Sequence, residues 1–135
     1  MSEMRFNPIT LDWVVMAPER ALRPDDFHPQ AASHLTRPPH RDDCPFCTGN
    51  EAMTPGEIAR VSAPDGSWLV RVVPNKYSVF DATLDVQRKK QGTFRSMSAS
   101  GMHEVVVEHP RHDLDLGEMD AAHLVMVLRM YRERY

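Results

Sequence analysis

The strongest fold signal in this sequence is a pair of apolar runs, Glu57-Ile58-Ala59-Arg60-Val61 and Trp68-Leu69-Val70-Arg71-Val72-Val73. Both runs contain β-branched side chains and the second begins with Trp68, a composition that is typical of strands. Asp65-Gly66 lies between them, and an Asp-Gly pair favours the tight turn of an antiparallel hairpin. Pro74 ends the second run because it lacks a backbone donor. The sequence therefore predicts an antiparallel hairpin over residues 57–73.

Two further strands and two loops are predicted on either side of this hairpin. Residues 9–17 hold a turn and an apolar run, and residues 102–108 hold a third β-branched run. Residues 24–43 contain four prolines and three histidines without apolar periodicity, which predicts an irregular surface loop. Residues 81–100 are polar and predict a mobile loop. Its basic triplet Arg88-Lys89-Lys90 has no interleaved aromatic residue and is interpreted as solvated.

The helix that the sequence predicts covers residues 117–135. Its apolar residues recur at helical spacing, and neighbouring apolar residues broaden the stripe. The stripe consists of Met119, Ala122, Val125, Met126, Leu128 and Met130. Asp120 lies in the predicted first turn, where the helix dipole favours an acidic side chain.

Composition limits the partners and the compartment. A chain of 135 residues is long enough for one domain with a sizeable core. Sixteen basic and nineteen acidic residues give a net charge of −3, which argues against broad attraction to nucleic acid or to an anionic membrane. The sequence has neither an apolar secretory core at its N-terminus nor a long apolar run, so we expect a cytoplasmic protein.

Two cysteines in one turn suggest a metal site. The motif is Cys44-Pro45-Phe46-Cys47, and the later run Glu108-His109-Pro110-Arg111-His112 ends in a histidine. Zinc takes four nitrogen or sulfur ligands, and a Cys-x-x-Cys pair supplies two of them. We therefore predict that Cys44, Cys47 and His112 bind zinc, with the fourth ligand open. The alternatives are two buried thiols beside a strand-end histidine, or a thiol oxidoreductase, although a redox pair normally caps a helix.

Five motifs occur in order along the chain and carry a family resemblance. They are Arg5-Phe6-Asn7-Pro8-Ile9-Thr10-x-x-Trp13, Ala17-Pro18-Glu19-Arg20-Ala21-Leu22-Arg23-Pro24, Cys44-Pro45-Phe46-Cys47-x-Gly49-Asn50, Val73-Pro74-Asn75-Lys76-Tyr77 and Gly101-x-His103-Glu104-Val105-x-x-Glu108-x-Pro110-x-His112. Together they resemble the N-terminal half of the galactose-1-phosphate uridylyltransferase family, a branch of the histidine-triad superfamily. The loops at residues 25–43 and 82–97 match least.

The resemblance implies a fold and a reaction. The fold is α+β of the histidine-triad type, with an antiparallel sheet and a packed C-terminal helix, and residues 1–135 form an N-terminal domain of a larger two-repeat architecture. In the reaction, a histidine attacks the α-phosphorus of a UDP-sugar and passes the uridylyl group to a sugar 1-phosphate. The family carries this nucleophile in a His-Pro-His motif, and the sequence contains no His-x-His. We therefore expect the chain alone to be inactive and the intact protein to be a dimeric zinc transferase of galactose metabolism.

The resemblance also assigns roles to individual residues. Cys44, Cys47 and His112 match zinc ligands, the fourth being the first histidine of His-Pro-His. Arg20 and Arg23 match arginines that bind the nucleotide phosphates across a dimer interface, the alternative being a solvated turn. The positions that match the uridine pocket are Phe46, Asn75, Tyr77 and Val105. Core packing is the alternative for Phe46 and Val105, and His103 and His109 are interpreted as structural.

Two other functions stay open. An adenylyl transferase or ADP-sugar phosphorylase of the same superfamily would share every motif and differ in the base that it prefers. A zinc-stabilised nucleotide-binding module without catalysis would use the same arginines together with Asn75 and Tyr77. A His-x-His sequence downstream would distinguish an enzyme from the binding module.

Overall fold

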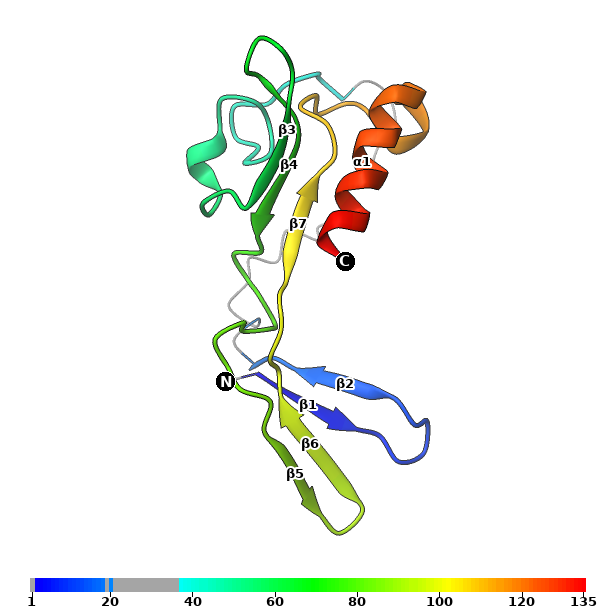
Figure 1. The fold of residues 1–135 in the computed structure, drawn as a ribbon. Coiled ribbons are helices and arrows are strands. Elements are labelled where there is room, and N and C mark those ends of the chain that lie inside the picture. Colours follow the sequence, from blue (N-terminus) through cyan, green and yellow to red (C-terminus); the bar gives the residue numbers. More distant parts are fainter. Residues whose placement is uncertain (1, 19, 21–36) are drawn as a thin grey trace. The chain divides into compact units, whose positions relative to one another are not determined.

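The strands that the structure describes form two antiparallel sheets, each in its own unit (Figure 1). The computed structural model describes residues 2–18, 20 and 37–135. The first unit comprises residues 1–28 and 77–103, and the second comprises residues 29–76 and 104–135. Among the described helices, none has both the length and the apolar character that a membrane span needs.

The second unit contains the predicted hairpin, which is confirmed. Its strands β3 (Ala59–Ser62) and β4 (Trp68–Pro74) are antiparallel, and β7 (Glu104–Val107) pairs with the other edge of β4. Gly66 adopts a φ of 86° in the turn, a conformation that favours glycine. The Asp65 carboxylate accepts a hydrogen bond from the Ser67 backbone N–H at 2.9 Å. Turn chemistry and side-chain composition thus agree, and the hairpin forms where the sequence indicates.

The core of the second unit is formed by side chains of β4, of α1 (Ala121–Arg134) and of the turn before it. Figure 1 shows the helix α1 beside the strands of this unit. The buried side chains that form the core are Val70, Val72, Met119, Val127 and Met130. Asp120 caps the helix, because its carboxylate accepts a hydrogen bond from the His123 backbone N–H at 2.8 Å. The preceding turn (Leu116–Glu118) is a separate 3-10 helix, η3, so α1 begins after Asp120 rather than at residue 117.

The predicted apolar stripe is confirmed only in part, because Met119 and Met130 are buried in the core and Met126 packs against it. The buried residues of the helix are His123, Val127 and Met130, which follow helical spacing. Ala122, Val125 and Leu128, which belong to the predicted stripe, are exposed. Apolar residues occur on several sides of this helix, so periodicity alone does not select the side that contacts β4.

The first unit contains a four-stranded sheet that the sequence predicts only in part. Its strand order is β2-β1-β6-β5, and all neighbours are antiparallel. The strands are β1 (Glu3–Phe6), β2 (Trp13–Met16), β5 (Arg88–Gln91) and β6 (Phe94–Ser98). The predicted strand in residues 9–17 is therefore present as β2, but it lies in a different sheet from the hairpin of the second unit.

The prediction of a mobile loop over residues 81–100 is wrong, because β5 and β6 form a hairpin there. Gly92, with a φ of 60°, lies in the connecting turn, and β6 gains a second partner in β1. The triplet Arg88-Lys89-Lys90 is exposed, as predicted, but it lies in a strand. In the same sheet, the guanidinium of Arg95 in β6 lies 5.4 Å from the ring centroid of Phe6 in β1.

Candidate metal centre and nucleotide-binding residues

Cys44, Cys47 and His112 come together in the second unit. Their ligand atoms all lie within 4.8 Å of one another, and the Cys47 Sγ lies 3.6 Å from the His112 Nδ1. Bond lengths of about 2.3 Å to sulfur and about 2.1 Å to nitrogen in a tetrahedral zinc site separate two such ligand atoms by about 3.6 Å. Cys47 is buried and the other two residues are half-buried. The donor types and their spacing therefore fit a zinc ion.

Local backbone hydrogen bonds bring the two cysteines into one turn. The Cys44 N–H donates to the Arg41 carbonyl at 3.3 Å, and the Cys47 N–H donates to the Cys44 carbonyl at 3.2 Å. The Arg41 N–H lies 3.4 Å from the Cys47 Sγ and donates to it. His112 joins this loop from a distant segment, because its N–H donates to the Pro39 carbonyl at 2.9 Å. Burial raises the pKa of the Cys47 thiol, whereas a bound cation would favour the thiolate.

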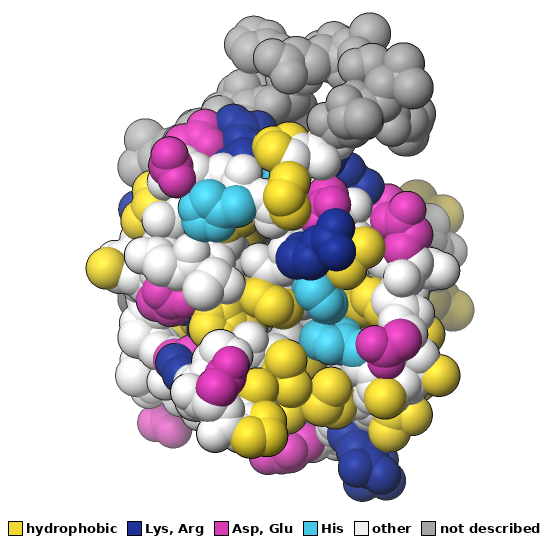
Figure 2. Space-filling model, turned by 90° about the horizontal axis from the view of Figure 1, so that it is seen from above, with side chains coloured by type: hydrophobic (Ala, Val, Ile, Leu, Met, Phe, Trp, Pro, Cys, Tyr) yellow, Lys and Arg dark blue, Asp and Glu magenta, His cyan; other side chains and the backbone are white. Residues whose placement is uncertain are grey.

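Among the described residues, no further histidine, cysteine or acidic residue joins this cluster. His109, the nearest substitute in sequence, is engaged elsewhere. Its ring packs on His123 with centroids 4.4 Å apart, and its Nδ1 accepts a hydrogen bond from the Arg111 N–H at 2.9 Å. Burial lowers the pKa of His109, which fits a structural role. Figure 2 shows histidine side chains among apolar and charged ones on one face of the molecule.

A buried arginine donates a hydrogen bond to the cysteine loop, a role that the sequence analysis missed. Arg71 is 1% exposed, and its Nη2 lies 3.4 Å from the Pro45 carbonyl, to which it donates. Its guanidinium lies 5.3 Å from the Trp68 ring centroid and 3.9 Å from a Glu57 carboxylate oxygen. The signal in the sequence was a charged residue within the apolar run of β4, where burial requires a polar partner.

The residues predicted to bind the nucleotide are divided between the two units. Arg20 and Tyr77 belong to the first unit and are half-buried, whereas Arg23 lies outside the described residues. Asn75 follows β4 in the second unit and is half-buried. Phe46, 40% exposed, lies between the two cysteines, and Val105 in β7 pairs with Val73 in β4. The exposure of Phe46 distinguishes it from a core residue.

His103, interpreted as structural, lies in the first unit. Its Nδ1 accepts a hydrogen bond from the Val79 N–H at 3.2 Å. Burial lowers the pKa of His103, and the positive charge of Arg20 lowers it further. These contacts agree with a neutral, structural imidazole.

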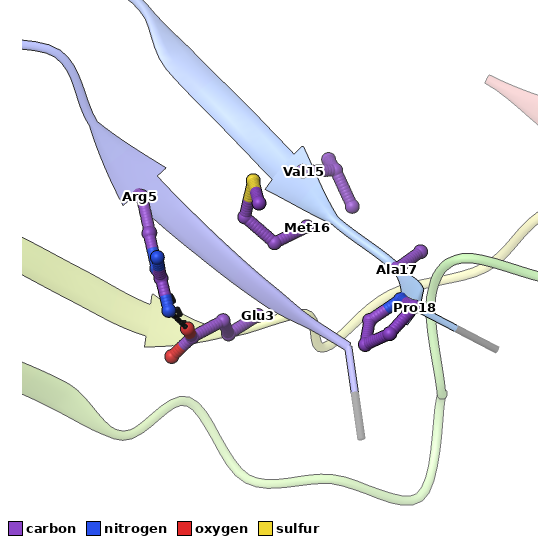
Figure 3. Close-up of a pocket in the computed structure, with 6 residues that line it drawn as sticks. All are labelled: Glu3, Arg5, Val15, Met16, Ala17 and Pro18. Carbon is purple, nitrogen blue, oxygen red and sulfur yellow. Dashed lines mark hydrogen bonds and ion pairs between the residues drawn. The ribbon is translucent and has the colours of Figure 1, made fainter. Parts of the chain in front are cut away.

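The first unit also contains a cavity of about 310 Å³ beside β1 and β2 (Figure 3). Its lining residues are Glu3, Arg5, Val15, Met16, Ala17 and Pro18. The Arg5 Nε donates to the Glu3 carboxylate at 2.7 Å, so the charge of Arg5 is already paired. None of the predicted site residues lines this cavity, which forms through the pairing of β1 with β2 and leaves no signal in the sequence.

A tyrosine on α1 offers a test of the second unit in solution. The Tyr131 hydroxyl donates to the Glu108 carboxylate, and burial together with this carboxylate raises the pKa of Tyr131 to about 12. Ionised tyrosine is therefore disfavoured in the fold, so the stabilising contact is complete below about pH 10 and is lost as the pH rises through the raised pKa. We expect Tyr131→Phe to remove a phenolate absorbance step near pH 12.

The matched control for this titration is Tyr135→Phe, which changes the tyrosine that follows α1 and leaves the Tyr131–Glu108 contact in place. This variant should leave the high-pH step in place. Loss of a step near the ordinary tyrosine value of about 10 in Tyr131→Phe would contradict the contact with Glu108.

The antiparallel sheets, the packed C-terminal helix and the Cys-Cys-His cluster are the features by which the chain can be classified. A family model described as "Galactose-1-phosphate uridyl transferase, N-terminal domain" matches residues 1–135. The chain therefore belongs to this family, which confirms the family and the α+β fold class that the motifs predicted.

Relatives with curated names include two kinds of protein. An ADP-glucose phosphorylase from Arabidopsis thaliana is 34% identical over 98% of this chain and 38% of its own length. A galactose-1-phosphate uridylyltransferase from Saccharomyces cerevisiae is 26% identical over 97% of this chain and 36% of its own length. The crystal structure of an Arabidopsis thaliana ADP-glucose phosphorylase with bound ADP-glucose matches with a TM-score of 0.55 and 29% identity, over 99% of this chain and 37% of that one. The chain thus spans less than two fifths of the length of these relatives.

Proposed function

We propose that residues 1–135 supply the metal-stabilised N-terminal domain of a nucleotidyltransferase that acts on a nucleotide sugar and a sugar 1-phosphate. The observation that carries this proposal is the family match over the whole chain. The names of the relatives support it, because they describe a phosphorylase of ADP-glucose and uridylyltransferases of galactose 1-phosphate. A homodimer, which the resemblance implies, and a cytoplasmic location, which the sequence composition predicts, belong to the same proposal.

The proposed reaction proceeds in two displacements on one phosphorus atom. A histidine nitrogen bonds to the α-phosphorus, and the bond from this phosphorus to the sugar 1-phosphate oxygen breaks. A phosphate oxygen of the second substrate then bonds to the α-phosphorus and releases the histidine. The chain contains no His-x-His, so we assign the nucleophile to sequence outside residues 1–135.

The residues of this chain would bind and orient the substrate. Arg20 and Arg23 would pair with the phosphate oxygens, where a guanidinium makes two parallel hydrogen bonds and keeps its charge. The nucleoside would contact Phe46, Asn75, Tyr77 and Val105. Zinc bound by Cys44, Cys47 and His112 would contribute folding free energy to this domain.

A second candidate function is phosphorolysis of an ADP-sugar, with inorganic phosphate as the acceptor. The specific observation in its favour is the 34% identity to an ADP-glucose phosphorylase over 98% of this chain. The two functions share the covalent step and the arginines, and they differ in the acceptor and in the base that the nucleoside pocket accepts. Tyr77 could stack on either base, so base preference needs a direct measurement.

The test is to incubate the intact protein with UDP-glucose or ADP-glucose labelled at the α-phosphate. We expect acid-labile label on the protein with one of the two sugars, and its release by galactose 1-phosphate or by inorganic phosphate. The isolated chain of residues 1–135 should stay unlabelled. Label on this chain, mapped to His112 for example, would refute our placement of the nucleophile. A folded intact protein that binds both sugars without labelling would instead indicate the non-catalytic binding module.

A further inference from the structure

We propose that Asn50 is a positioning residue that holds the metal loop, residues 41–50, in its ligand-bearing conformation before a metal ion binds. The inference rests on the proposed function, because the metal site is part of it, but the evidence for the inference is the hydrogen bonding of the loop. Neither the family resemblance nor the names of the relatives assign a role to this side chain.

The Asn50 side chain donates hydrogen bonds to backbone carbonyl oxygens in the first part of the loop. Its Nδ2 donates to the carbonyl oxygens of Arg41 at 3.0 Å, Asp42 at 3.1 Å and Cys44 at 2.8 Å. An amide NH₂ has two hydrogens, so the three oxygens share them. The Asn50 backbone N–H donates to the Cys47 carbonyl at 3.2 Å. The half-buried Asn50 thus makes hydrogen bonds to the backbone on both sides of Cys44.

These hydrogen bonds act on the two sulfur ligands through the backbone that carries them. Three carbonyl oxygens that point toward one place repel each other unless a donor lies between them, and Asn50 is that donor. The Cys44 carbonyl also accepts from the Cys47 N–H, which sets the spacing of the two thiols. The Arg41 N–H that donates to the Cys47 Sγ comes from the residue whose carbonyl Asn50 holds.

Hydrogen bonds of Glu51 connect the C-terminal end of the loop to β4, so the backbone next to Asn50 is held in place. The Glu51 Oε1 accepts from the Gly49 N–H at 3.0 Å and from the Trp68 Nε1 at 2.7 Å. Trp68 is 4% exposed in β4. The hydrogen bonds of Asn50 and Glu51 involve no ligand atom, so in this proposal they hold the loop with or without a bound metal ion. Loss of one outer partner of a metal ligand typically weakens metal affinity about 10- to 100-fold.

The first test measures the zinc affinity of the intact protein by competition with a chelator. Asn50→Ala removes the donors, and Asn50→Asp keeps the shape but places a carboxylate oxygen against the three carbonyls. We expect both variants to bind zinc about 10- to 100-fold more weakly than the unmodified protein. The matched control is Asn7→Ala in the first unit, where the Asn7 side chain accepts from the Ile9 N–H at 3.0 Å. This control should keep the unmodified affinity.

The second test needs no metal and separates this inference from the proposed function. In metal-free protein, we expect the amides of Cys47 and Asn50 to exchange hydrogen faster in Asn50→Ala than in the unmodified protein or in Asn7→Ala. Protection of the β4 amides should be retained. If the unmodified protein binds no zinc, the metal proposal fails while the exchange result still decides the role of Asn50. Unmodified exchange in both Asn50 variants would overturn the role, and so would a general loss of β4 protection.

Discussion

Replacing Cys44 by serine should remove the bound zinc from the intact protein, from about one ion per chain to none, and should destabilise the fold strongly. A structural zinc site binds with a free energy of about 10–16 kcal/mol in zinc-finger peptides, and that binding energy is folding energy. Cys44 is half-buried, so a serine hydroxyl at this position has access to water. The measured loss of stability would then come from the metal rather than from an unpaired buried hydroxyl. Metal analysis and thermal unfolding are the measurements.

The matched control for this substitution is His40→Gln. His40 lies close in sequence to the cysteine loop and its Nε2 is 3.1 Å from the Asp42 carboxylate, but it does not belong to the ligand cluster. This variant should keep its zinc and nearly all of its stability, because exposed pairs contribute little. A folded intact protein without metal and with both thiols reactive would contradict the zinc assignment.

Sequence patterns predicted the elements whose signals are local. The hairpin of β3 and β4 has β-branched runs on both sides of an Asp-Gly turn, and each signal lies within a few residues of the structure that it forms. The hairpin of β5 and β6 was missed for the opposite reason. All residues of β5 are exposed, so no alternation of apolar and polar side chains marks it. Its pairing with β6, which in turn pairs with β1, depends on a segment far away in the sequence.

The sequence predicted all three ligands of the candidate metal site, but not the contacts that bring them together. Cys44 and Cys47 lie in one turn, so their spacing alone indicated a shared ion. His112 lies 65 residues beyond Cys47, and the fold brings it there through the pairing of β4 with β7 and the bond to the Pro39 carbonyl. The sequence marks both Arg71, as a charged residue within an apolar run, and Asn50, as the end of the cysteine motif, but it does not show which backbone carbonyls they contact. Contacts of this kind become visible only when the loop is folded.

Arg20→Ala should reduce nucleotide-sugar turnover by the intact protein about 10²- to 10³-fold, or by about 3–4 kcal/mol of transition-state stabilisation. A guanidinium that pairs with phosphoryl oxygens binds more strongly as negative charge develops on them, so the loss should fall on kcat/KM. Arg20→Lys should recover part of the activity, because an ammonium keeps the charge but not the paired hydrogen bonds. The matched control is Arg88→Ala on the exposed strand β5, which should turn over normally.

The same substitution has a readout that does not depend on turnover. The charge of Arg20 is, after burial, the second cause that lowers the pKa of His103. In Arg20→Ala the pKa of His103 should therefore rise toward its ordinary value, which an NMR titration of the imidazole would detect. Melting temperature should change little, since a single charge near the surface contributes little to folding. One outcome would contradict the phosphate role of Arg20. In it, Arg20→Ala raises the pKa of His103 but turns over normally, whereas Asn75→Ala abolishes turnover. Arg20 would then lie beside His103, as in the structure, and the phosphates would bind elsewhere.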